Sequence, residues 1–190
     1  MFRFSKFVAV LAIAAAGAAT AGAQAVTSPS KPYSLGIAGG AAIPTGSLSN
    51  ANGVNGLNAN TGYDVMGSLG VAAPHYPVSF RGDVAYNNFG LKNTPSNYHV
   101  WSVTGNAVYS LPAQAAARPY LIGGLGAYRP NSSTGNVTVS GDTKLGFNVG
   151  GGIIVPLSGF NAFIESRYNQ YAAGNGRSMS FVPVTFGVMF

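Results

Sequence analysis

The chain has 190 residues, no cysteine and only 7% charged residues, with ten Lys and Arg against four Asp and Glu. A soluble domain carries about 25% charged residues, so this chain has too few charges to coat a water-exposed surface. Without cysteine, disulfides and thiolate metal sites are excluded, and the basic residues are scattered singly, which argues against nucleic-acid binding.

The first 23 residues have the three parts of a secretory signal peptide. Arg3 and Lys6 form a basic start, a short apolar run follows, and Ala21-Gly22-Ala23 is a small-x-small cleavage site. The apolar run is shorter than the roughly 20 residues that a membrane-spanning helix needs. We therefore expect a signal peptide at 1–23 and one mature domain at 24–190, whose net charge falls from +6 to +4 because two cations leave with the signal.

Eight segments of alternating character follow, each with a bulky apolar face and a small or polar face. This period of two predicts β-strands whose two faces meet different surroundings. Where the alternation is clear, every charge lies on the small or polar face. Segment 119–129 is glycine-rich, and its alternation is unclear. The predicted strands are 33–43, 63–71, 78–87, 101–111, 119–129, 145–155, 161–168 and 181–190.

The predicted connections alternate in length. Short turns on the periplasmic side, with both chain termini, and long loops outside are typical of outer-membrane barrels. The long connections, rich in Asn, Gly and Ser, are 44–61, 90–98, 130–143 and 169–178, and the short ones are 73–77, 112–118 and 158–159. Aromatic residues near strand ends predict two interfacial girdles, made of Tyr33, Tyr63, Tyr86, Trp101, Tyr109, Tyr120, Tyr128 and Tyr168.

The last predicted strand, FVPVTFGVMF, ends on an aromatic residue. Val184, Phe186, Val188 and Phe190 share one apolar face. Such a face at the C-terminus is the pattern that barrel precursors present for assembly. We therefore expect it to be an assembly signal, with the barrel assembly machinery and periplasmic chaperones as partners during biogenesis. The folded protein is expected to be a monomer.

Six stretches resemble the small eight-stranded outer-membrane barrels of the OmpA/OmpX-like superfamily. The resemblance implies an all-β fold, an eight-stranded antiparallel up-and-down transmembrane β-barrel in the outer membrane of a Gram-negative bacterium. Unlike OmpA itself, the chain ends at the barrel, so we expect no peptidoglycan-binding domain. The stretches are YSLGIAGGAAIPTG from Tyr33, VSFRGDVAYN from Val78, RPYLIGGLGAY from Arg118, FNVGGGIIVPL from Phe147, FIESRY from Phe163 and the terminal FVPVTFGVMF.

A soluble ligand barrel of the lipocalin type is the alternative fold. Lipocalins are also exported antiparallel barrels, but they keep the apolar face inside and a charged face outside. In this chain one face of each strand is apolar, and the other carries mostly Gly, Ala, Ser and Asn. Neither face has the charged surface that a soluble barrel presents to water.

Four charges are predicted to meet inside the barrel. Arg81 and Asp83 on the third strand and Glu165 and Arg167 on the seventh have the same parity, and these strands lie opposite each other in a barrel of eight. Unpaired ions in so narrow an interior would cost several kcal/mol, so we expect a paired network, extended by Asp64. The network is interpreted as a structural plug. The alternative, which the resemblance to OmpA suggests, is a narrow pore for ions or small solutes that is gated by exchange of charge partners.

Catalysis is not expected. Some small outer-membrane barrels modify lipid A with Ser, His and an acid, but His75 falls in a short turn, and His99 has a parity different from that of Ser102 and lies apart from Ser96. Two isolated histidines without cysteine provide no metal site, and no cofactor is expected.

The expected partners at the outer rim are outer-membrane lipids and lipopolysaccharide. Four cations are placed near it, where they would contact lipopolysaccharide phosphates: Lys92, Arg129, Lys144 and Arg177. The uncharged, Asn-rich loops offer surfaces for other cells or sugars, with plain solvated loops as the simpler interpretation.

Overall fold

The computed structural model describes residues 33–50, 56–73, 77–92, 94–112, 116–135, 137–174 and 176–190. The signal peptide expected at 1–23 and His75 lie outside these ranges. No helix within the described ranges is long and apolar enough to cross a membrane.

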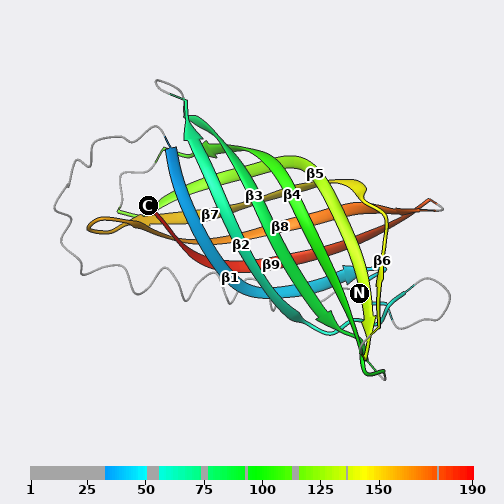
Figure 1. The fold of residues 1–190 in the computed structure, drawn as a ribbon. Coiled ribbons are helices and arrows are strands. Elements are labelled where there is room, and N and C mark those ends of the chain that lie inside the picture. Colours follow the sequence, from blue (N-terminus) through cyan, green and yellow to red (C-terminus); the bar gives the residue numbers. More distant parts are fainter. Residues whose placement is uncertain are drawn as a thin grey trace, which may run out of the picture.

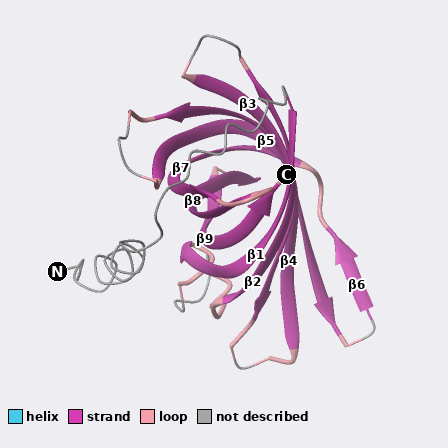
Figure 2. Ribbon diagram, turned by 90° about the vertical axis from the view of Figure 1, so that its left-hand side faces the viewer, coloured by secondary structure: helices cyan, strands magenta, loops and turns pink. Residues whose placement is uncertain are grey.

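One antiparallel sheet holds all the strands, and it closes on itself. Apart from β6, each strand pairs with its neighbours along the chain, β5 pairs with β7, and β1 pairs with β9, so eight strands form a closed wall (Figure 1). Strand β6 lies outside this wall, because it pairs only with residues 131–134 of β5 (Figure 2). The strands are β1 Tyr33–Gly46, β2 Gly62–Ala72, β3 Val78–Gly90, β4 Ser96–Ser110, β5 Arg118–Thr134, β6 Val137–Ser140, β7 Lys144–Pro156, β8 Asn161–Gly174 and β9 Arg177–Met189.

The predicted fold class is confirmed, but two predicted loops are wrong in extent. Residues 130–143 contain the end of β5 and all of β6, and residues 169–178 are mostly strand, with a tight turn between Gly174 and Arg177. Gly174 and Gly176 have φ of 90° and 71°, a conformation that glycine adopts without steric cost. These segments are rich in Asn, Ser and Thr, which favoured a loop prediction. They form strands nevertheless, because the neighbouring strands extend beyond the apolar part of the wall and pair with their backbone groups.

The two ends of the barrel differ in their connections. The end that holds Tyr33, Phe190 and the β2–β3, β4–β5 and β7–β8 connections is termed the turn end. The opposite end holds the β1–β2, β3–β4, β5–β7 and β8–β9 connections and is termed the loop end. Backbone hydrogen bonds between Leu35 and Phe190, of 3.0 and 2.8 Å, join the two chain ends of the wall at the turn end.

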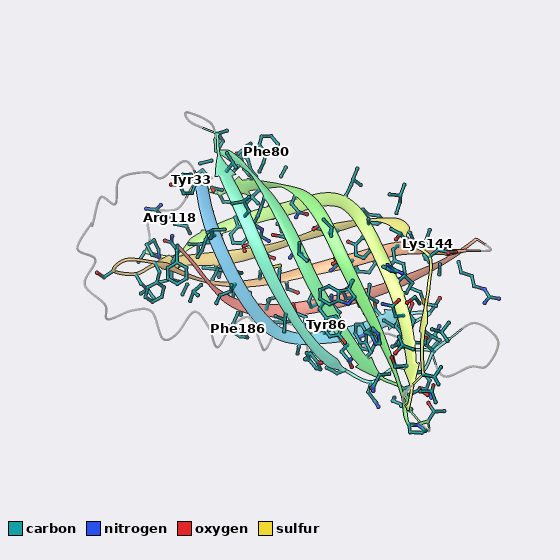
Figure 3. The ribbon with its side chains drawn as sticks, viewed as in Figure 1. Tyr33, Phe80, Tyr86, Arg118, Lys144 and Phe186 are labelled. Atoms are coloured by element: carbon teal, nitrogen blue, oxygen red, sulfur yellow. The ribbon has the colours of Figure 1, made fainter. Side chains whose placement is uncertain are left out.

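Large apolar side chains cover the outside of the wall, and polar ones fill the inside. Ile37, Val103 and Phe186 are each at least 60% exposed, whereas Asn106, Asn148 and Thr185 are buried in the lumen. Figure 3 shows the outward side chains standing off the ribbon, with Tyr33 and Phe80 near the turn end and Phe186 on the wall between the two ends. The lipocalin alternative is therefore wrong, because its apolar face would line the inside.

Strand β5 has the clear alternation that its glycine-rich sequence concealed. Tyr120, Ile122 and Tyr128 are buried in the lumen, while Leu121 and Leu125 are exposed. The prediction that Tyr120 and Tyr128 belong to an aromatic girdle is wrong, because both rings point inward.

Outward aromatic residues nevertheless mark both ends of the apolar wall. Tyr109 and Trp101, both about half exposed, are eight residues apart on the outer face of β4. At about 3.4 Å per residue and a tilt of about 40°, they are separated by about 20 Å along the barrel axis, close to the apolar height of an outer membrane. The wall therefore has the dimensions of a membrane-spanning surface.

Candidate functional site in the barrel lumen

Four buried charges form a closed ring across the middle of the lumen. The Arg81 guanidinium donates from Nη2 to both Glu165 oxygens, at 2.8 and 2.7 Å, and its Nε lies 3.0 Å from Asp83. The Arg167 guanidinium lies 2.8 Å from Asp83 through Nη1 and 2.8 Å from Glu165 through Nε. All four residues are at most 6% exposed. Each carboxylate thus touches both guanidinium groups, and the ring has no net charge.

Parity and strand order explain why these four residues meet. Arg81 and Asp83 are two residues apart on β3, and Glu165 and Arg167 are two residues apart on β8, so each pair points to one side of its strand. Strands β3 and β8 lie opposite each other in the wall of eight. Their long side chains therefore reach across the lumen and join two walls that share no backbone hydrogen bond.

Neutral side chains from two further strands complete the ring. The Tyr120 hydroxyl of β5 donates to Glu165 Oε2 at 2.6 Å, and the Asn106 amide of β4 donates to Asp83 Oδ2 at 2.9 Å. Asn148 on β7 in turn donates to Asn106 Oδ1 at 2.8 Å. Sequence reasoning missed Tyr120, since the neighbouring glycines hid its inward parity. Five strands thus contribute to one polar layer.

Two glycines on β7 make room for this layer. A Cβ on Gly152 would lie 2.5 Å from the Tyr120 hydroxyl, and one on Gly150 would lie 2.7 Å from Arg167 Cα. Both distances are shorter than real Cβ contacts, so any side chain there would displace the ring or the β8 backbone. These glycines therefore serve close packing of the lumen.

Asp64 does not join the ring as the sequence predicted. Its carboxylate is 3% exposed, and its Oδ1 has no hydrogen-bond partner among the described residues. It shares with Asp83 and Arg167 the lining of a void of about 10 Å³ on the loop side of the ring. Asp64 is therefore a buried acceptor beside the ring, and it forms no ion pair with another described residue.

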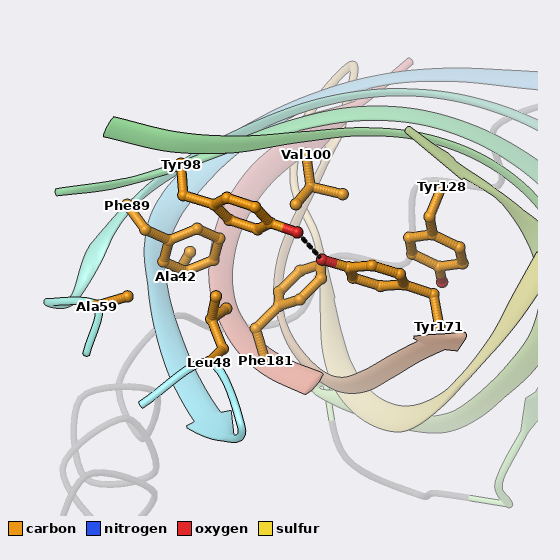
Figure 4. Close-up of a cluster of buried hydrophobic side chains, with 9 residues drawn as sticks. All are labelled: Ala42, Leu48, Ala59, Phe89, Tyr98, Val100, Tyr128, Tyr171 and Phe181. Carbon is orange, nitrogen blue, oxygen red and sulfur yellow. Dashed lines mark hydrogen bonds between the residues drawn. The ribbon is translucent and has the colours of Figure 1, made fainter. Parts of the chain in front are cut away.

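An apolar and aromatic cap closes the lumen at the loop end (Figure 4). The Tyr98 and Tyr171 hydroxyls share a hydrogen bond of 2.7 Å across the mouth, and Tyr171 stacks on Tyr128 with ring centroids 5.4 Å apart. Leu48, from the β1–β2 connection, is fully buried beneath them. The cap consists of Ala42, Leu48, Ala59, Phe89, Tyr98, Val100, Tyr128, Tyr171 and Phe181.

The β1–β2 connection is therefore not a plain solvated loop in its described part. Backbone hydrogen bonds link Leu48 with Ala59 at 3.0 Å, and Asn60 and Lys92 tie it to the β3–β4 connection. Sequence reasoning saw only its Asn and Gly residues. Leu48 and Leu57 in an otherwise polar stretch were the available signal that this connection packs inward.

On the turn side of the ring, the lumen opens into a cavity of about 200 Å³. Arg81 and Tyr120 line its inner end, and Val108, Ile154 and Met189 line its sides. The lumen thus runs from an open vestibule, through the charged ring and a very small void, to the cap.

Of the four cations predicted at the outer rim, Arg129 and Lys144 lie on paired strands, with Lys144 the cross-strand partner of Tyr128. Lys92 follows β3, while Arg129, Lys144 and Arg177 lie on β5, β7 and β9. Lys144 forms an ion pair with the exposed Asp142 at 3.3 Å, and the other three cations are exposed. Their contact with lipopolysaccharide stays a prediction.

The expected assembly signal lies on the outer face of β9. Phe186 and Phe190 are about 60% exposed, and Val184 and Val188 are half-buried on the same parity. Its recognition by the assembly machinery stays a prediction.

The described residues contain no arrangement for nucleophilic or metal chemistry. His99 points outward next to Tyr86, with ring centroids 5.9 Å apart, and no hydrogen bond joins it to a serine or a carboxylate within the described ranges. Ser102 faces the lumen, and Ser96 shares a hydrogen bond with Thr134. The described part also holds no group of three His, Cys, Asp or Glu residues that could bind a metal ion.

Comparison with solved structures shows the same fold. Neisserial surface protein A is 18% identical, with a TM-score of 0.67 over 84% of this chain and 96% of that one. The N-terminal barrel domain of OprF from Pseudomonas aeruginosa is 14% identical, with a TM-score of 0.50 over 83% and 97%. The attachment invasion locus protein Ail of Yersinia pestis is 16% identical, with a TM-score of 0.50 over 84% and 100%.

Among curated proteins, none matches this chain significantly. The family model described as "Outer membrane protein beta-barrel domain" matches residues 11–190, which is nearly the whole chain. The closed barrel with an apolar outer wall agrees with that match. The chain therefore belongs to the outer membrane protein beta-barrel domain family and is an integral protein of the bacterial outer membrane.

Proposed function

We propose that this protein is a non-enzymatic barrel with an envelope-structural or surface-interaction role, whose lumen is closed to solutes. The observation that carries the proposal is the presence of two side-chain layers across the lumen. The ring of Arg81, Asp83, Glu165 and Arg167 fills its middle, and the cap held by the Tyr98–Tyr171 hydrogen bond closes the loop end. A solute would have to displace both layers.

We further propose that the turn end faces the periplasm and the loop end faces the outside. This orientation rests on the two longest connections, 47–61 and 135–143, which both lie at the loop end, since outer-membrane barrels have short periplasmic turns and longer external loops. It leaves the hairpin of β5 and β6 beyond the outer leaflet, where all four residues of β6 are exposed. Surface contacts with sugars or other cells would be made from this end.

Conductance in a planar lipid bilayer tests the closed lumen. The mature barrel is expected to give no steady current above the bare membrane. The double variant Arg81→Ala with Arg167→Ala is also expected to give none, because the cap stays in place. Heat-dependent gel mobility of each sample verifies that it is folded. A steady current from the wild-type protein would contradict the proposal.

The second candidate is a narrow pore gated by exchange of charge partners. One observation favours it: Asp64 is buried beside Arg167 with a free acceptor oxygen, and both line the small void next to the ring. Arg167 could leave Glu165 for Asp64 and open one side of the ring. If brief openings occur in the wild-type protein, Asp64→Asn should abolish them, while the outward Ser166→Ala on β8 should leave them unchanged.

A further inference from the structure

The outer wall carries an aromatic row across β2 to β5, near the loop end. Val65, Tyr86, Trp101 and Arg129 are successive cross-strand partners on the outward parity. The Tyr86 and Trp101 rings lie 4.9 Å apart, and Tyr63 and Tyr86 lie 6.2 Å apart. Amphipathic rings at one height on a membrane-facing wall mark the level of the lipid headgroups.

A polar row follows one outward position nearer the loop end. Asn88, His99 and Asn131 are cross-strand partners there, and the Asn88 amide donates to the Tyr86 hydroxyl at 3.1 Å. His99 Nδ1 and Asn131 Oδ1 are shielded from solvent and have no hydrogen-bond partner among the described residues. Next to the aromatic row on its other side, Val84 and Val103 are exposed and apolar. Toward the loop end, successive outward positions of these strands are therefore first apolar, then aromatic and then polar.

Arg129 gives this surface an exposed positive charge. It is exposed and lies beside Trp101 on the neighbouring strand. The chain has only four carboxylates, of which three are buried in the lumen and the fourth, Asp142, pairs with Lys144. Asp142 lies near Arg129, because the neighbouring Gly141 N–H donates to the Pro130 carbonyl at 2.8 Å, but its carboxylate pairs with Lys144. Within the described part of the chain, no ion pair engages Arg129, so its charge is available to an anionic ligand.

We propose that Tyr86, Trp101, His99, Arg129 and Asn131, here termed the boundary patch, bind the phosphorylated sugar headgroup of lipopolysaccharide. The guanidinium would hold a phosphate by charge-assisted hydrogen bonds. The free polar atoms of His99 and Asn131 suit sugar hydroxyls, and the rings pack against the first part of the acyl chains. The inference rests on the proposed orientation, which puts this row in the outer leaflet. Of the four cations that the sequence placed at the rim, the inference assigns lipopolysaccharide binding to Arg129.

Trp101 is the only tryptophan of the chain, so its fluorescence reports on the boundary patch directly. The folded mature barrel in phosphocholine nanodiscs is titrated with bisphosphorylated lipid A. A saturable change in Trp101 emission is expected for the wild-type protein. Arg129→Gln should weaken the binding about tenfold or more, whereas Arg177→Gln, which removes an exposed cation on the distant strand β9, should leave it unchanged.

Three results would overturn the inference. Equal weakening by Arg129→Gln and Arg177→Gln would show only general attraction to the basic protein. Equal binding of dephosphorylated lipid A by the wild-type protein would exclude phosphate recognition, and this comparison needs no variant. Equal binding of phosphatidylglycerol would exclude recognition of the sugar headgroup. None of these results bears on the closed lumen, which is tested by conductance.

Discussion

Replacing Glu165 with alanine is expected to lower the free energy of unfolding by about 3–5 kcal/mol, the usual cost of removing one partner from a buried ion pair. Glu165 is 1% exposed and accepts hydrogen bonds from Arg81 and Tyr120, and it pairs with Arg167. Its loss would leave two buried guanidinium groups with one carboxylate between them. Urea unfolding in detergent micelles, followed by Trp101 fluorescence, measures the change.

A control and a double variant make this test specific. Ser166→Ala alters the next residue of β8, which points outward, and should change stability by less than about 0.5 kcal/mol. Combining Glu165→Leu with Arg81→Met removes one positive and one negative charge together. The remaining Asp83–Arg167 pair stays balanced, so the double variant should be more stable than Glu165→Ala. If Glu165→Ala unfolds like the wild-type protein, the ring does not stabilise the barrel.

Replacing Gly40 with valine is expected to prevent most of the protein from closing its barrel. Gly40 lies on β1 at the seam with β9, where an added Cβ would collide with the Val184 carbonyl oxygen and lie 2.9 Å from Thr185 Cα. Both obstacles are backbone atoms of a paired strand and cannot move aside alone. The strain should amount to about 3 kcal/mol or more, at the upper end for overpacked sites.

Gly67 on β2 offers a matched control. It points outward, and no atom lies within 4 Å of the position that its Cβ would take. Gly67→Val should therefore refold as well as the wild-type protein, helped by the preference of valine for strands. The measurement is the fraction of protein that shifts on a gel only after boiling. A Gly40→Val variant with the full heat-dependent shift would show that the seam has room to spare.

Several features of this barrel were predictable from the sequence because they depend on local alternation. The period of two in each strand separates outward Ile37 and Val103 from inward Asp83 and Asn106 whatever the neighbouring strands do. The same parity, together with counting strands around a barrel, was enough to bring Arg81 and Glu165 to facing walls. The predicted alternation of connection lengths was less reliable, because residues 169–178 are mostly strand with a tight turn between Gly174 and Arg177.

Other features needed the closed barrel. The sequence did not show which residues of β5 point inward, because its glycines have no side chain to mark either face of the strand. Pairing with β4 and β7 decides that Tyr120 points toward Glu165. The extra strand β6 forms because β5 continues beside β4 as far as Thr134.

The cap is the clearest case of tertiary control. Leu48 lies in a polar connection, and its burial depends on Phe89, Tyr98 and Tyr171, which are distant in sequence and meet only at the loop end. A strand carries its two faces in its own residue order, so the sequence by itself determined the apolar outer wall and the polar lumen. Which side chains fill the mouth is decided by contacts between distant segments, and such contacts exist only once the wall has closed.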